Sequence, residues 1–139
     1  MRKLLCAAGI LLLCATAVLW ADHAEENRIM TEMAEAMNLF ADRMESLSAP
    51  EDFIEAANDY SATIEAIGKE MVAIMKAHPE WGEDPPADVE KSIEAYMEAA
   101  GRYDPAMQTA TKYANDHPDH DGCQKAMSRL AKAAYEMYQ

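Results

Sequence analysis

Large apolar residues recur along this chain at alternating steps of three and four, the spacing that places them on one face of an α-helix. Four such series, which we call seams, occur after residue 22 and are each long enough for several helical turns. They run from Met30 to Leu47, from Phe53 through Met71 and Ile74 to His78, from Val89 through Tyr96 to Ala114, and from Cys123 to Met137. No stretch rich in Val, Ile and Thr alternates apolar with polar residues as a half-buried strand does. The pattern therefore predicts helices over about 24–47, 51–78, 87–114 and 120–138.

Turn-forming segments separate the four series. Ser48 and Pro50 offer an N-cap and a first-turn proline for the second helix. The segments 78–86 and 115–122 contain proline and glycine, which interrupt helices. Connections this short join antiparallel helices, so we expect an all-α, antiparallel up-down-up-down four-helix bundle forming one domain over 22–139.

The N-terminal segment has the parts of a secretory signal. Two basic residues precede an uncharged apolar run over 4–20, and the polar sequence begins after it. We expect a signal peptide over 1–21, cleaved after residue 17 or 21, and a mature protein that is periplasmic or secreted. An uncleaved membrane anchor is an alternative because the run approaches the roughly 20 residues that span a bilayer. A lipoprotein attached at Cys14 is another.

Acidic residues dominate the charge of the chain. Twelve Lys and Arg against 25 Asp and Glu give a net charge of −13, and loss of Arg2 and Lys3 with the signal peptide takes it to about −15. Such a field repels phosphate backbones, so we expect no nucleic-acid partner. No Ser, His and Asp arrangement, Glu-x-x-His pair or glycine-rich phosphate loop is present, and we expect no enzymatic activity.

Potential metal ligands gather at the third break in the pattern. His117, His120 and Cys123 follow one another at steps of three among several acidic residues. Imidazole and thiolate groups suit zinc or copper, so these residues form a candidate metal site. The alternative is a plain turn and helix N-cap, with Cys123 pointing into the core. As the one cysteine after the signal segment, Cys123 cannot form an intrachain disulfide.

Methionine is the most unusual component, because ten of the 11 methionines follow the signal segment and nearly all occupy the helical seams. Thioethers are soft copper ligands, but they also fill irregular cores and line adaptable binding surfaces. An exported four-helix bundle in which Met and His meet near one end, or pole, of the bundle resembles the soluble b-type cytochromes. That resemblance implies a haem site at His78, Met30 and Met137. The chain departs from that family in lacking a histidine near the end of its fourth predicted helix.

The leader followed by Met-, Ala- and Glu-rich helices, as in segment 29–37 and then 48–53, resembles small exported bacterial helical proteins of uncharacterised function. This resemblance implies a compartment and a fold, and no activity. We expect a non-catalytic binding or interaction module of the periplasm or cell envelope, whose partner is an envelope protein or a second copy. Its contact surface is a Met-bearing helical face or the pole with Trp81, Tyr96 and Tyr103. The alternative function is a carrier of copper, zinc or haem.

Overall fold

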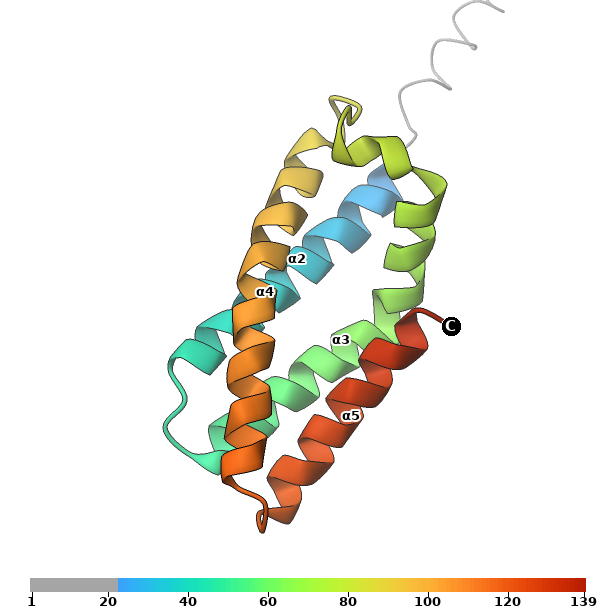
Figure 1. The fold of residues 1–139 in the computed structure, drawn as a ribbon. Helices are drawn as coiled ribbons and strands as arrows, with labels where there is room; N and C mark the ends of the chain where they lie inside the picture. The colour runs from blue at the N-terminus through green and yellow to red at the C-terminus, as the bar shows by residue number, and fades with distance from the viewer. Residues whose placement is uncertain (1–22) are drawn as a thin grey trace, which may run out of the picture.

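The computed structural model describes residues 23–139, so the expected signal peptide over 1–21, its cleavage sites and Cys14 lie outside the described residues. Residues 23–139 contain no strand, which confirms the all-α class. The elements are α2 (Ala24–Glu45), α3 (Pro50–Ala77), the 3-10 helix η1 (Pro79–Gly82), α4 (Glu90–Asp116) and α5 (Asp121–Met137) (Figure 1). Each α-helix begins and ends close to its predicted bounds.

The start of α3 shows how local side chains define a helix end. Ala49, and not Ser48, occupies the N-cap position. The carboxylate of Asp52 accepts hydrogen bonds from the backbone N–H of Ser48 at 3.2 Å and of Ala49 at 3.0 Å, and from the Ser48 hydroxyl at 2.6 Å. These bonds lower the pKa of Asp52, with the Ser48 hydroxyl as the largest cause. The acid three residues into the helix therefore supplies the cap that Ser48 was expected to supply.

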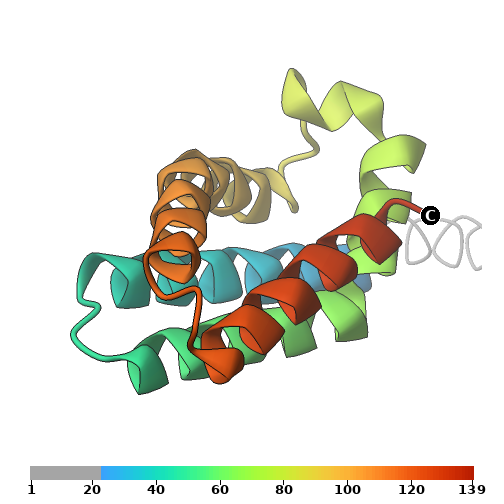
Figure 2. The same ribbon diagram turned by 60° about the horizontal axis from the view of Figure 1, so that its bottom comes forward.

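Helices consecutive in the chain run in opposite directions, as predicted (Figure 1). Their packing partners are not all consecutive, however. α2 packs against both α3 and α4, and α5 packs against α3, whereas α4 and α5 contact each other little. The order around the bundle is therefore α4, α2, α3, α5. Two of its packed pairs, α2 with α4 and α3 with α5, consist of parallel helices (Figure 2).

Polar contacts between α2 and α4 agree with their parallel direction, because early residues of one helix contact early residues of the other and later residues contact later ones. Near the start of α2 and α4, Asn27 donates to the carbonyl of Asp88 at 2.8 Å. Further along the same pair, Arg102 donates to Asp42 at 2.6 Å. In the other pair, the Arg129 guanidinium donates to both carboxylate oxygens of Glu65, at 3.0 and 2.7 Å.

The core lies along the predicted seam of α2. Its large members are Met30, Met33, Met37, Phe40 and Met44, all buried. The Phe40 ring stacks on Tyr60 of α3 with centroids 5.0 Å apart and lies 6.3 Å from Tyr103 of α4. α4 contributes small residues instead, and these let it lie close to its neighbours. They are Ala99, Ala106, Ala110 and Ala114.

Gly68 brings α3 close to the end of α5. A Cβ atom at this position would lie 2.9 Å from Cγ and 3.0 Å from Sδ of Met137. Gly101, inside α4, differs because nothing lies within 4 Å of its Cβ position. Both glycines cost the helix the same backbone entropy, but Gly68 is crowded by a neighbouring side chain and Gly101 is not.

We expect Gly101→Ala to raise the free energy of unfolding by about 0.5–1 kcal/mol, because alanine loses less backbone entropy in a helix. Gly68→Ala should lack this gain, since the new methyl group displaces Met137. Urea denaturation followed by circular dichroism measures both. An equal gain from the two substitutions would contradict the close approach of α5 to Gly68.

Candidate binding groove

A difference in helix length leaves part of the bundle uncovered. α4 has 27 residues and α5 has 17. At 1.5 Å per residue these lengths are about 40 and 25 Å. Figure 1 shows α5 ending near the middle of the molecule, while α3 and α4 continue toward η1. Beyond the end of α5, the facing sides of α3 and α4 lack the fourth helix that would cover them.

Two neighbouring chambers with shared lining residues occupy this space. The upper chamber, of about 140 Å³, lies next to η1, and the lower chamber, of about 310 Å³, lies next to the end of α5. Met71, Met75 and Tyr96 line both, so we treat them as one feature and call it the α3–α4 groove. The other upper residues are Met30, Ile74, His78, Pro79, Trp81, Gly82, Ile93 and Met97. The other lower residues are Met33, Met37, Tyr60, Ile64, Val72, Ala100, Tyr103, Asp104, Ala134, Met137 and Tyr138.

The rim of the groove exposes large apolar side chains. Met75 is 49% exposed, Met97 58% and Tyr138 66%. Only two other large apolar residues within 23–139 are as open to solvent, Leu39 and Tyr135. Scattered exposed apolar residues are ordinary, but a cluster around a concave surface marks a site for binding. The groove is therefore the best candidate functional site in the described part of the chain.

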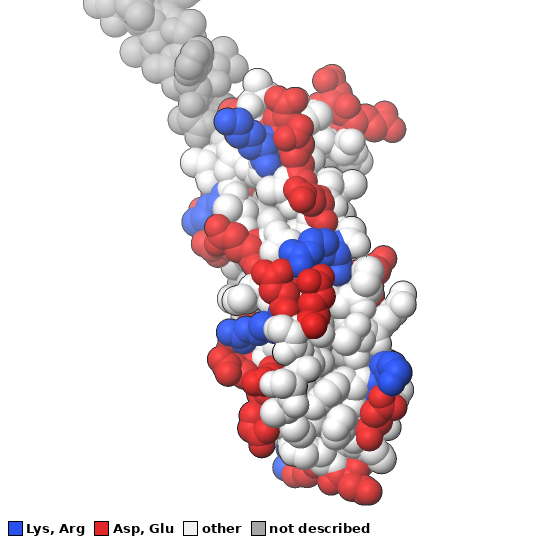
Figure 3. All heavy atoms as spheres, turned by 90° about the vertical axis from the view of Figure 1, so that its left-hand side faces the viewer, with Lys and Arg blue, Asp and Glu red and all other residues white. Residues whose placement is uncertain are grey.

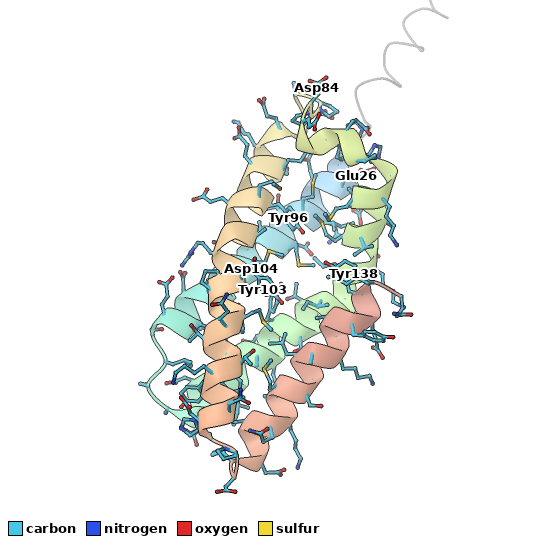
Figure 4. The ribbon with its side chains drawn as sticks, viewed as in Figure 1. Glu26, Asp84, Tyr96, Tyr103, Asp104 and Tyr138 are labelled. Atoms are coloured by element: carbon cyan, nitrogen blue, oxygen red, sulfur yellow. The ribbon has the colours of Figure 1, made fainter. Side chains whose placement is uncertain are left out.

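Tyrosine hydroxyls supply the polar groups of the groove. Figure 4 shows Tyr96 and Tyr103 on α4 and Tyr138 at the end of α5, and all three line the lower chamber. Burial raises the pKa of Tyr60, Tyr96 and Tyr103 above that of an ordinary phenol, and for Tyr60 the nearby Tyr103 adds to the effect. These phenols stay protonated at neutral pH and can donate hydrogen bonds. A mostly apolar surface with a few fixed donors is typical of small-molecule sites.

The residues of the haem hypothesis are divided between the two chambers. Met30 and His78 both line the upper chamber. Met137 lines the lower one, because α5 ends before it reaches the pole where the sequence pattern placed it. Of the aromatic residues expected at that pole, Trp81 and Tyr96 line the upper chamber, and Tyr103 lines the lower chamber.

His78 is the C-cap residue of α3 and is held by aromatic contacts. Its ring stacks on Trp81, with centroids 3.9 Å apart and an interplanar angle of 10°. His23 meets the same indole edge-on at 5.0 Å. The Nδ1 atom of His78 lies 3.5 Å from a carboxylate oxygen of Glu80. These contacts fix the imidazole at the upper end of the groove.

The structure does not gather His117, His120 and Cys123 around one point. His117 Nδ1 lies 2.8 Å from the carbonyl of Tyr113, and its ring stacks on that tyrosine. His120 Nδ1 accepts a hydrogen bond from the backbone N–H of Cys123 at 3.2 Å and so caps α5. Cys123 is fully buried, and burial raises its thiol pKa. Among residues 23–139 no group of three or more His, Cys, Asp or Glu side chains is placed to hold a metal ion.

A larger hollow, of about 680 Å³, runs along the outside of α4. All of its lining residues belong to this one helix and lie between Asp104 and Asp116. A single helix cannot surround a ligand, whereas binding sites enclose most of the ligand surface. We therefore assign the candidate site to the α3–α4 groove, which four helices form together.

Sequence reasoning missed several groove residues, above all Met71, Met75 and Met97. Met71 belongs to a predicted seam, and so it was expected to face other helices. Met75 and Met97 stand one position after seam residues, on the two helices that border the groove. The sequence did contain one signal, a large apolar residue next to the seam on each of the two helices. This signal indicates a shared binding surface only when the two helices are known to face each other.

Comparison with known protein families, with curated proteins and with solved structures finds no match for this chain. None of the helices within residues 23–139 combines the length and the apolar character needed to cross a membrane. On the face that Figure 3 shows, carboxylates outnumber the lysine and arginine groups. The groove and this acidic surface are therefore the features of the described residues that bear on function.

Proposed function

We propose that this protein is a non-catalytic binding module of the cell envelope that takes an apolar small molecule into the lower chamber of the α3–α4 groove. The early end of α5 carries the proposal, because it leaves methionine and tyrosine side chains of three helices facing an uncovered space. The export signal expected over 1–21 supports the location. The absence of a recognisable nucleophile or general base in the sequence supports a binding role.

The volume and chemistry of the lower chamber favour an uncharged small ligand. The lower chamber alone reaches the volume of roughly 300 Å³ at which small-molecule sites begin. Its walls are apolar apart from the tyrosine hydroxyls and Asp104. The carboxylate of Asp104 and the net charge of −13 disfavour an anionic ligand. A ligand with one hydrogen-bond acceptor, such as a carbonyl, would use the phenol donors.

The proposal is tested by titration with N-phenyl-1-naphthylamine, a neutral apolar dye that fluoresces in apolar sites. Ala100 is half-buried and lines the lower chamber, so Ala100→Phe fills the space and should weaken dye binding at least about tenfold. Ala95 lies on the exposed surface of α4 outside the groove. Ala95→Phe is the matched control and should bind dye as the unaltered protein does.

Equal dye binding by both phenylalanine variants, with unchanged circular dichroism, would contradict the proposal. Sedimentation analysis distinguishes another occupant of the groove. A dimer that Ala100→Phe dissociates would assign the groove to a second copy of the chain and would also contradict the small-molecule proposal. The proposal is supported if the protein is a monomer that binds the dye and if Ala100→Phe, but not Ala95→Phe, weakens that binding.

A further inference from the structure

We infer that the upper chamber is a site for a soft monovalent cation, Cu(I), whose three or four ligands are drawn from the thioethers of Met30, Met71, Met75 and Met97 and the imidazole of His78. This inference does not rest on the small-molecule ligand proposed for the lower chamber. Its donors differ from the metal ligands His117, His120 and Cys123 expected from the sequence, and they share only Met30 and His78 with the haem site that the resemblance implied.

The first observation is the concentration of soft donors around one small space. Four of the eleven residues that line the upper chamber are methionines, and a fifth is His78. They come from three helices, with Met30 on α2, Met71 and Met75 on α3, and Met97 on α4. The chamber has a volume of about 140 Å³, so donors on its opposite walls would reach a common ion by rotating inward. Long, flexible methionine side chains make that adjustment easily.

The second observation is that core packing accounts for only half of these methionines. Met30 and Met71 are buried and fill space between helices. Met75 and Met97 keep about half of their surface in solvent, yet both line the same chamber from facing helices. An exposed thioether contributes little to packing. It does give a soft ion a route to donors that are otherwise enclosed.

The third observation is that neighbouring groups orient two of the donors. The Glu80 carboxylate, 3.5 Å from Nδ1 of His78, favours the proton on that nitrogen and leaves the lone pair on Nε2. A carboxylate beside the second ring nitrogen is the usual partner of a metal-binding histidine. The Tyr96 hydroxyl donates to Sδ of Met75 at 3.6 Å and uses one of the two sulfur lone pairs. The other lone pair remains available.

The donor set also determines which ion fits. Thioethers bind Cu(I) and bind oxygen-seeking cations such as Mg²⁺ and Ca²⁺ poorly. Zn²⁺ prefers thiolate, imidazole and carboxylate ligands, and the upper chamber offers one imidazole. We therefore expect the chamber to select Cu(I) over Zn²⁺.

The test is an anaerobic titration of the purified protein with Cu(I) in competition with bicinchoninate. We expect one Cu(I) per chain and at least about tenfold weaker binding in Met75→Leu/Met97→Leu, a change that preserves side-chain volume. The control is Met107→Leu/Met127→Leu, because neither residue lines the groove and both are partly buried. Ala100→Phe should leave Cu(I) binding unchanged, which separates this inference from the function of the lower chamber.

A second measurement identifies the donors directly. In protein labelled with ¹³C at the methionine methyl groups, Ag(I) as a redox-inert substitute should shift the signals of Met30, Met71, Met75 and Met97. Equal Cu(I) affinity in the two double-leucine variants would overturn the inference. So would Ag(I) shifts confined to other methionines, or Cu(I) binding that is lost in His117→Ala/His120→Ala.

Discussion

Phe40→Ala is expected to lower the free energy of unfolding by about 3–5 kcal/mol, the range observed when a fully buried phenylalanine is truncated. Phe40 is 1% exposed and touches aromatic rings of two other helices, Tyr60 at 5.0 Å and Tyr103 at 6.3 Å between centroids. Its loss therefore leaves a cavity where α2, α3 and α4 meet. Urea denaturation with linear extrapolation measures the change.

The matched control is the neighbouring residue of α2. Leu39 is 49% exposed, so Leu39→Ala should change the free energy of unfolding by no more than about 0.5 kcal/mol. A loss below about 1.5 kcal/mol for Phe40→Ala, or equal losses for the two variants, would show that the centre of the bundle is not packed around Phe40.

Stability is expected to fall steeply as the pH rises from about 10 to 12. Burial raises the pKa of Tyr60, Tyr96 and Tyr103 in the folded state, whereas the unfolded chain loses these protons near pH 10. Above that pH the folded state binds more protons than the unfolded state, so each further unit favours unfolding. The slope is about 1.4 kcal/mol per pH unit for each group that titrates in the unfolded chain but not in the folded one. Tyr113 and Cys123, whose pKa values burial also raises, add to the same loss.

Urea denaturation at several pH values between 8 and 12 measures this slope. Tyr60 is 4% exposed, and Tyr60→Phe should reduce the alkaline slope by about 1.4 kcal/mol per pH unit. Tyr135 has an exposed ring, and Tyr135→Phe is the control that should leave the slope unchanged. An identical slope in the unaltered protein and in Tyr60→Phe would show that the Tyr60 hydroxyl ionises freely and that the groove around it is more open than described.

Much of the fold follows from local signals in the sequence. The three-and-four spacing of apolar residues and the proline- and glycine-containing breaks predicted four helices with nearly correct bounds. The seam from Met30 to Met44 is buried as expected. Such signals succeed because helix periodicity, caps and breaks involve residues within a few positions of one another.

The candidate site was only partly accessible in this way. His78, Met30, Met137, Tyr96 and Tyr103 were singled out from the sequence and do line the groove. They were expected at one end of the bundle, however. That they line a single groove together with Met71, Met75 and Met97 was not predicted. Seam positions on a predicted helix show that it buries a face, but they do not show against which other helix.

The number of helices, their directions and the residues they bury could thus be predicted from the sequence, because each depends on short stretches of chain. The pairing of α2 with α4 and of α3 with α5 depended on how whole helix surfaces fit together. The groove arises from that pairing combined with the short length of α5, which leaves α3 and α4 facing each other without a cover. Residues far apart in sequence acquire a common function there only because helix packing brings them to one space.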